Sequence, residues 1–322
     1  MTEPPAVSVV VASHARALRL RWLLNALEEQ TLARERWELI VVHDYDAATA
    51  ARVMERHPLG ESGTLRHHAI EPGTGSPARQ RNIGWRAARA PLVAFTDDDC
   101  RADPGWLEGM LRAAESSEGA VVQGRVRPDP FEWMVFLAPH VRTLEVDPVN
   151  PYAQTANILY PRALLERLEG FDEAAVAGED VGLSLRARAA GARFAAAPDA
   201  LVYHAVESHP LPGILKQNLK WRYLAYLVKR HPEFRRELTL GVFWDPEHLM
   251  VTLAAAGLAG ARRNRALLAL AAPYAVRVAG RRGPGAKSRA IALAELPGAF
   301  VRQFAEVAGM AAGSVTHRTL LL

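Results

Sequence analysis

The stretch Pro91-Leu92-Val93-Ala94-Phe95-Thr96-Asp97-Asp98-Asp99 ends a short apolar run with three consecutive carboxylates. The apolar part is typical of a buried β-strand, so the acids are expected at the carboxyl end of that strand. Three neighbouring carboxylates repel one another and raise each other's pKa unless a cation lies among them. Oxygen ligands favour magnesium or manganese, which also bind phosphate oxygens. The stretch therefore indicates a metal and phosphate site, with a solvated acidic turn as the competing interpretation.

The sequence before this stretch alternates between apolar β-branched runs and helical patterns. Such alternation predicts a parallel α/β sheet, and ligands bind such sheets at the carboxyl ends of the strands. Asp44, which follows the second strand, should therefore lie near the Asp97–Asp99 triplet. Strands are predicted at 7–11, 38–42, 64–70 and 91–95, and helices at 20–27 and 47–57, from Ser76-Pro77 and from Asp103-Pro104.

The pattern continues less regularly from residue 119 onward. Glu179 and Asp180 fall in the first turn of a predicted helix, where acids commonly complement the helix dipole. A carboxylate in that place can also act as a general base toward an acceptor hydroxyl. His204 ends a strand, and three interpretations of it stay open: a metal ligand, a phosphate contact or a half-buried histidine. Strands are predicted at 120–126, 155–159 and 200–203, and helices from Pro161 and from Gly178 to Gly191.

Arg79 and Arg81 lie near the start of the helix that follows the glycine-rich loop 71–77. Helix N-termini and arginines both suit phosphate oxygens, while a solvated helix face is the plainer interpretation. The loop lacks the Gly-Lys-Ser/Thr of a P-loop, and the chain has no GxGxxG. P-loop ATPases and Rossmann dinucleotide enzymes are therefore disfavoured.

The composition is that of a globular protein, with 322 residues of which 49% are hydrophobic. The one cysteine, Cys100, is expected to pack in the core; it excludes a disulfide framework and suits a reducing compartment. Neither a signal peptide nor a stretch long enough to span a bilayer is expected. The expected location is therefore cytoplasmic, with peripheral contact to the inner membrane face as an extension of that prediction.

The charge is distributed unevenly along the chain. Residues 1–210 hold 22 Lys or Arg and 29 Asp or Glu, whereas residues 211–322 hold 17 and 6. This predicts a catalytic α/β domain over 1–210 and a basic, mainly helical region over 211–322. Such a region suits an anionic membrane surface or an acidic ligand, and it is equally the solvated face of an Arg-rich sequence. One apolar stripe in it suits membrane contact, packing on the catalytic domain or an oligomer. Its members are Leu215, Leu219, Tyr223 and Tyr226.

Five segments, taken together and in this order, resemble the family 2 glycosyltransferases of the GT-A fold. They are VSVVVAS, WELIVVHD, SPARQRNIGWRAARAPLVAFTDDDC, TANILYPRALLERLEGFDE and AGEDVGLSLRARAAG, and they span roughly residues 6–206. The resemblance implies a nucleotide-binding GT-A sheet with flanking helices, followed here by a helical C-terminal extension. It also implies inverting transfer of a sugar from a nucleoside-diphosphate donor.

The resemblance implies a role for each matching residue. The expected substrate-binding residues are Asp44 and Arg81 at the nucleotide, Asn82 beside them, Asp97 and Asp98 in the DxD segment, and Asn157 on the sugar or acceptor side. The expected ligands of Mn²⁺ or Mg²⁺ are Asp97 and Asp99, with His204 as a further candidate. The expected catalytic base is Asp180, with Glu179 orienting that base or the acceptor.

Three positions depart from the family pattern. The second strand ends in His43-Asp44-Tyr45-Asp46 rather than in two acids followed by Gly-Ser, so the base of the nucleotide is not indicated. Glu169-Gly170 stands where the family usually has paired glycines before Phe-Asp. The segment Gln217-Asn218-Leu219-Lys220-Trp221 resembles the QxxRW box of processive synthases, but with Lys for Arg and no spanning helices it does not predict processivity.

The combined prediction is a metal-dependent glycosyltransferase acting on a saccharide, lipid-linked or small-molecule acceptor. Cell-surface polysaccharide, glycolipid or glycoconjugate synthesis is the expected setting. One alternative is a metal-dependent nucleotidyl or phosphoryl transferase, since those enzymes also cluster acids around magnesium, and another is an inactive nucleotide-sugar-binding module. A nucleic-acid partner is not expected, because the catalytic half is acidic and the basic region carries no recognised nucleic-acid motif.

Overall fold

The computed structural model describes residues 4–138, 140–280 and 285–322. The chain forms two compact units. The first comprises the residues up to Met134 and Arg142–Glu207, and the second comprises Val135–Val141 and Ser208–Leu322. The predicted domain boundary at residue 210 stays a prediction, because compactness does not show that either part folds alone.

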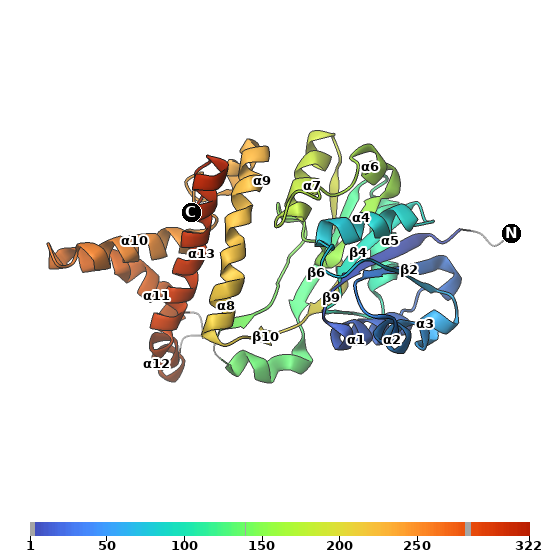
Figure 1. Ribbon diagram of the computed structural model, residues 1–322, viewed down its shortest axis with the longest axis horizontal. Coiled ribbons are helices and arrows are strands. Elements are labelled where there is room, and N and C mark those ends of the chain that lie inside the picture. Colours follow the sequence, from blue (N-terminus) through green and yellow to red (C-terminus); the bar gives the residue numbers. More distant parts are fainter. Residues whose placement is uncertain (1–3, 139, 281–284) are drawn as a thin grey trace. The chain divides into compact units, whose positions relative to one another are not determined.

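The first unit is built on an eight-stranded sheet (Figure 1). Its strands are β1 (Val7–Ser13), β2 (Trp37–His43), β3 (Leu65–Ala69), β4 (Leu92–Asp97), β5 (Cys100–Ala102), β6 (Val121–Pro128), β8 (Ile158–Pro161) and β9 (Phe194–His204). They lie in the order β3-β2-β1-β4-β8-β6-β9-β5. β3, β2, β1 and β4 are parallel, which confirms the predicted parallel part. The sheet as a whole is mixed, because β8 runs antiparallel to both neighbours and β5 antiparallel to β9.

Helices cover both faces of this sheet. They are α1 (Ala17–Glu28), α2 (Ala47–Ala50), α3 (Pro58–Glu61), α4 (Pro77–Ala87), α5 (Trp106–Ser116), α6 (Arg162–Arg167) and α7 (Glu179–Ala189). Shorter helical turns are η1 (Arg34–Arg36), η2 (Ala51–Glu55), η3 (Pro130–Leu137) and η4 (Thr155–Asn157). Strands β7 (Val141–Arg142) and β10 (Glu207–Ser208) lie where the chain passes between the two units.

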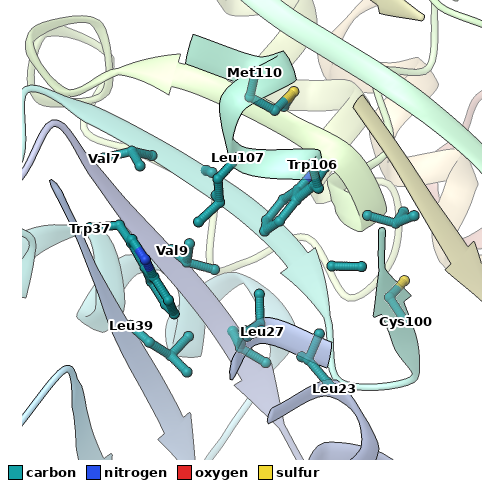
Figure 2. Packing of buried hydrophobic residues seen from close by; sticks show 14 of the residues in the cluster. Val7, Val9, Leu23, Leu27, Trp37, Leu39, Cys100, Trp106, Leu107 and Met110 are labelled. Atoms are coloured by element: carbon teal, nitrogen blue, oxygen red, sulfur yellow. The ribbon is translucent and has the colours of Figure 1, made fainter. Parts of the chain in front are cut away.

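Each face of the sheet has its own apolar core. Because successive strand residues point to opposite faces, Val9 of β1 joins one core and Val10 joins the other. In the first core, Leu27 of α1 and Trp106 of α5 lie near Val9 (Figure 2). Cys100 is buried in the same core, which confirms its predicted packing role. The second core is covered by α4, α6 and α7.

The start of α4 follows the prediction from its sequence. Ser76 caps the helix by accepting a 3.2 Å hydrogen bond from the backbone N–H of Arg79, and Pro77 occupies the first turn. The helix after the acidic triplet begins at Trp106 rather than at Asp103, because residues 100–102 first form β5. β9 begins at Phe194, ahead of the predicted residue 200.

The second unit is helical, as predicted for residues 211–322, over the parts that the structure describes. Its α-helices are α8 (Leu211–Asn218), α9 (Leu224–Arg230), α10 (Pro246–Gly260), α11 (Ala272–Gly280), α12 (Ala286–Ala294) and α13 (Leu296–His317). Its 3₁₀ helices are η5 (Leu219–Tyr223), η6 (Pro232–Glu237) and η7 (Arg265–Ala271). Among the described helices, none combines the length and the apolar composition that a bilayer crossing requires.

α13 packs against α8, η5 and α9. The contact with η5 is close, since a Cβ placed on Gly313 would lie 2.0 Å from the carbonyl oxygen of Arg222. Of the predicted apolar stripe, only Leu219 is exposed, at 47%, and its other members are half-buried. Most of that stripe therefore takes part in packing.

Candidate active site

Three neighbouring parallel strands end at the same edge of the sheet. Ser13 at the end of β1 is paired in register with His43 of β2, and Ala12 is paired with Asp97 of β4. Asp44 follows β2 directly, and its Oδ2 lies 2.6 Å from Nδ1 of His14. Asp44 and the triplet therefore share one edge, as predicted from strand order. Contact between Asp44 and a nucleoside stays a prediction.

Asp97, Asp99 and His204 form a cluster of potential metal ligands. Each offers one ligand atom, and these atoms all lie within 4.8 Å of one another. Strand pairing explains the meeting of distant residues, because Cys100 of β5 is opposite His204 at the end of β9. The Nε2 atom of His204 lies 3.7 Å from Oδ1 of Asp99. The fold thus brings together the three residues that were predicted to hold a divalent ion.

The polar atoms of this cluster fit a cation. Oδ1 of Asp99 is buried without a hydrogen-bond partner among the described residues. A buried carboxylate oxygen in that state is costly unless it binds a cation. Nδ1 of His204 lies 2.9 Å from the carbonyl oxygen of Ala205, which can only accept, so Nδ1 carries a proton and Nε2 is the ring nitrogen on the side of Asp99. Two carboxylates and an imidazole nitrogen form a suitable donor set for a divalent ion.

Arg81 on α4 connects this cluster with the start of α7. Its Nη2 donates to Oδ1 of Asp97 and its Nη1 donates to Oε1 of Glu179, both at 2.8 Å. Only 8% of the Arg81 side chain is exposed. Burial lowers the pKa of Arg81, but Asp97, Glu179 and Asp180 more than offset it, so the pKa lies above the ordinary value and the guanidinium stays charged. Arg81 therefore fixes the spacing between the acidic triplet and α7.

Asp180 has the acidity expected of a general base. It lies in the first turn of α7, beside Glu179. The pKa of Asp180 is raised to about 7, mainly by burial and also by Glu179 and Asp97, against the opposing effect of Arg81. The backbone N–H of Val181 donates a 2.8 Å hydrogen bond to Oδ1 of Asp180. A carboxylate with a pKa near neutrality can accept a proton from a hydroxyl at physiological pH.

Asp98 is not part of the cation cluster. Its Oδ2 accepts a 2.6 Å hydrogen bond from the hydroxyl of Ser13, whose Oγ lies 2.7 Å from the hydroxyl of Tyr45. Because the single proton of Ser13 is directed to Asp98, Tyr45 donates to Ser13. Burial raises the pKa of Asp98 to about 7. The carboxylate of Asp98 thus ties β4 to the end of β1, and its predicted substrate-binding role stays a prediction.

Asn82 likewise has a structural role. Its Nδ2 donates to the carbonyl oxygen of Phe171 and to Glu173, both at 2.9 Å. Its Oδ1 accepts from the backbone N–H of Phe171 at 2.8 Å and from Nε1 of Trp85 at 2.9 Å. The side chain is buried and its four hydrogen-bonding positions are filled. Asn82 therefore anchors the loop before α7 to α4, and its predicted substrate contact stays a prediction.

The side-chain amide of Asn157 is also held by hydrogen bonds within the fold, and its predicted place on the sugar or acceptor side stays a prediction. Its Oδ1 accepts a 2.8 Å hydrogen bond from Nε1 of Trp106. Its Nδ2 donates to the carbonyl oxygens of Arg125 and Ala200, at 2.9 and 2.8 Å. A Cβ on Gly124 would lie only 2.3 Å from that Nδ2, so the amide is enclosed by β6 and β9. Asn157 bridges the two strands at the register shift between residues 124 and 125.

Arg16, in the loop after β1, is a site residue that the sequence patterns do not single out. Its Nη1 donates a hydrogen bond to Oδ2 of Asp99 and lies 3.6 Å from Oδ1 of Asp98. Its Nη2 lies 4.0 Å from Glu207. Burial lowers the pKa of Arg16, but these acids more than offset it and the pKa is raised. The one available signal is its position after β1, at the same sheet edge as Asp44.

The family model described as "Glycosyltransferase like family 2" matches residues 4–223, which is more than half of the chain. The chain belongs to this family. Its GT-A fold and the cluster of acids at the sheet edge agree with the resemblance seen in the sequence motifs. Catalytic and ligand roles of single residues are not decided by this membership.

Three curated relatives of this family 2 member match between 52% and 67% of its length. The pre-mycofactocin glycosyltransferase of Mycobacterium tuberculosis is 29% identical over 178 residues, covering 52% of this chain and 37% of that protein. The putative glycosyltransferase EpsH of Bacillus subtilis is 28% identical, covering 52% and 46%. The glycosyltransferase AglE of Haloferax volcanii is 24% identical, covering 67% and 71%. The chain thus spans less than half the length of the first two relatives.

Solved structures share the fold of this family 2 chain. Residues 1–349 of TarS from S. aureus in complex with UDP give a TM-score of 0.52 at 17% identity, covering 97% of this chain and 91% of that one. The mannosyltransferase PcManGT from Pyrobaculum calidifontis, in complex with GDP-Man and Mn²⁺, gives 0.57 at 20% identity, covering 98% and 88%. At these identities the likeness establishes the fold alone.

Proposed function

We propose that the chain transfers a sugar from a nucleoside-diphosphate donor to an acceptor hydroxyl, with inversion at the anomeric carbon. The observation that carries the proposal is the role of Arg81 as a bridge. It connects Asp97, in the cation cluster, with Glu179, which adjoins Asp180. A cation site and a carboxylate with a pKa of about 7 are thereby held close together. Membership of glycosyltransferase family 2 supports this reaction class.

The proposal assigns a divalent ion, Mn²⁺ or Mg²⁺, to Asp97, Asp99 and His204. When bound, such an ion supplies positive charge to a departing diphosphate. The chain's own contribution is to hold the ligands in place. Arg81 orients Asp97 through a 2.8 Å hydrogen bond, and Ala205 fixes the tautomer of His204 through its carbonyl oxygen. Metal dependence is thus part of the proposal.

Asp180 is the proposed general base. It accepts the proton of the acceptor hydroxyl while the acceptor oxygen forms a bond to the anomeric carbon. The bond from that carbon to the diphosphate oxygen breaks, and the diphosphate leaves with the electron pair. Glu179 supports this step, because its charge beside Asp180 raises the proton affinity of Asp180.

The donor is proposed to lie along the edge formed by the ends of β1, β2 and β4. Asp44 would accept hydrogen bonds from the ribose or the base edge. The neighbouring TarS and PcManGT structures contain UDP and GDP-Man. These complexes support a nucleotide or nucleotide-sugar ligand as the class of donor, and they do not indicate which base or sugar this chain binds. The proposed acceptor is a hydroxyl of a saccharide, lipid-linked or small molecule in cell-surface polysaccharide, glycolipid or glycoconjugate synthesis.

The first experiment is a thermal-shift panel of UDP-, dTDP- and GDP-sugars with Mn²⁺ or Mg²⁺, since a ligand of the native state raises the melting temperature. The sugar that binds is then incubated with candidate acceptors, and the nucleotide product is identified. Nucleoside diphosphate is expected. Release of pyrophosphate or free sugar phosphate would instead identify a nucleotidyl or phosphoryl transferase. Binding without turnover on any acceptor class would favour the inactive binding module.

A further inference from the structure

The second unit carries an arm whose apolar side chains face solvent. The arm consists of the C-terminal half of α10, the turn after it, η7 and the start of α11 (Figure 1). Every residue from 262 to 270 is exposed, and η7, with the sequence RALLALA, has no buried residue. Leu258 and Leu268 are 52% and 44% exposed. Leucines grouped in this way usually mark a surface that another body covers.

The arm is an ordered structure that turns its leucines outward. Asn264 caps η7 by accepting a 2.9 Å hydrogen bond from the backbone N–H of Ala266. A Cβ on Gly257 would lie 2.5 Å from the carbonyl oxygen of Leu267, so the backbone of η7 rests directly on α10. The side chain of Leu267 packs on the same helix, since a Cβ on Gly260 would lie 2.5 Å from its Cδ1, whereas the side chains of Leu258 and Leu268 stay exposed. Their exposure is therefore a property of the local fold.

The charge of the arm has one sign. Between Glu247 and Glu295 the sequence contains no Asp or Glu and eight Lys or Arg. Three of the arginines, Arg262, Arg263 and Arg265, are exposed beside the leucines. No carboxylate of the described residues lies within 4.0 Å of any of them. The combination of exposed leucines and unpaired arginines matches a surface that is anionic outside and apolar beneath.

We infer that this arm docks the protein on an anionic lipid bilayer, with Leu258 and Leu268 entering the interface and the arginines binding lipid phosphates. A second copy of the chain fits this surface less well. In a two-fold dimer formed through the arm, the arginine clusters of the two copies would face and repel each other. The inference goes beyond sugar transfer and does not depend on it. It also moves the predicted membrane contact from the stripe around Tyr223 to the arm.

The test uses the full chain and vesicles of phosphatidylcholine with and without phosphatidylglycerol. Wild-type protein should float with the phosphatidylglycerol vesicles, remain behind with pure phosphatidylcholine, and be released by high salt. The triple variant R262Q/R263Q/R265Q should bind on the order of 100-fold more weakly, since each basic residue near an anionic surface contributes about fivefold to the affinity. The matched control, K216Q/K220Q/K229Q, removes the same charge from α8, η5 and α9 and should bind like wild type.

A second measurement reports the arm itself. Because Cys100 is buried, a fluorophore can be placed selectively on Leu268→Cys, and on Lys229→Cys as a control. The Leu268 label should shift to the blue on phosphatidylglycerol vesicles, and the Lys229 label should not. Three results would overturn the inference. The two triple variants lose vesicle binding equally, or wild type binds neutral and anionic vesicles equally well, or the protein binds no vesicles and forms a dimer that the arm substitutions dissociate. The melting temperature and the nucleotide binding of each variant are measured as well. An unchanged melting temperature excludes misfolding, and unchanged nucleotide binding separates the result from a failure of the transfer proposal.

Discussion

Nη2 of Arg81 lies 2.8 Å from Oδ1 of Asp97, in an ion pair whose arginine is almost wholly buried. The same guanidinium binds Glu179, so a single side chain neutralises acids from β4 and α7. Buried charges of this kind depend on one another, because removal of one partner leaves the others uncompensated. The geometry of the candidate site therefore rests on Arg81 as much as on the acids.

Arg81→Gln should destabilise the protein by about 3–5 kcal/mol, because it leaves Asp97 and Glu179 without their cation. The measurement is the free energy of unfolding in urea. Arg79→Gln provides the matched control, since Arg79 is exposed on the same helix and its side chain contacts only a loop carbonyl. Similar stabilities of the two variants would show that the buried ion pairs do not hold α4 to α7.

Asp180→Asn should abolish transfer while preserving binding of donor and metal. In wild-type protein the transfer rate should fall as the pH drops through about 7, because protonated Asp180 cannot act as a base. The readouts are the pH–rate profile and donor binding by thermal shift. Asp199→Asn, which removes an exposed carboxylate of the same unit, should leave both unchanged. Normal turnover of the Asp180 variant would remove the proposed base.

The same substitution should raise stability at high pH. The pKa of Asp180 is about 7 in the folded protein and near 3.8 when unfolded, so ionisation opposes folding increasingly between those values. Above about pH 8, Asp180→Asn should be more stable than wild type by up to about 4 kcal/mol. Below about pH 4 the difference should vanish, because the carboxyl is then protonated in both states. Denaturation curves at the two pH values provide the measurement.

Much of the first unit could be predicted from local patterns. The apolar runs of β1, β2 and β4 and the Ser76-Pro77 start of α4 depend on nearby residues alone. β5 was missed because three residues carry no periodicity, and its strand character comes from pairing with β9, a hundred residues away along the chain. Strand direction also depends on residues far away in the sequence, so the segment 158–161 does not predict that β8 is antiparallel to its neighbours.

The candidate site was predictable to a similar extent. Asp97 and Asp99 were predicted from the DxD segment and His204 from its place at a strand end, and the pairing of β5 with β9 explains physically why they meet. Sequence cannot tell whether an amide faces a ligand or a backbone, so the hydrogen bonds of Asn157 to backbone carbonyls could not be predicted. Arg16 was missed because its acidic partners lie more than eighty residues away.

Asp99→Asn should remove metal-dependent donor binding. Oδ1 of Asp99 is buried, unpartnered and adjacent to His204, so it is the oxygen best placed to bind a cation. The thermal shift given by nucleoside diphosphate with Mn²⁺ should disappear in this variant. Asp98→Asn is the comparison, because that side chain is bound to Ser13 and should retain the shift. A persistent, EDTA-sensitive shift in the Asp99 variant would place the cation elsewhere.

Glu169→Gly should stabilise the protein by about 1 kcal/mol. Glu169 has a φ of 60°, in the left-handed region that costs a residue with a Cβ about 1–2 kcal/mol. Glycine is unstrained there, although its greater freedom in the unfolded chain offsets part of the gain. The substitution also restores the paired glycines usual in the family. A parallel Glu166→Gly control, within the helix α6, should instead lose stability, and a loss at both positions would refute the strain argument.

His248 should make the stability of the second unit fall with rising pH. Burial lowers the pKa of His248, but Asp245 and Glu306 more than offset it and raise the value to about 9. Because the folded pKa exceeds the unfolded value of 6.5, the stabilisation is fully present below about pH 6 and is lost as the pH rises through 9. The expected loss is up to about 3 kcal/mol. Thermal melts between these pH values should show it in wild type, and His248→Gln should flatten the dependence, whereas His209→Gln, at a half-buried histidine of the same unit, should not. An equally steep dependence in the His248 variant would assign the effect to another group.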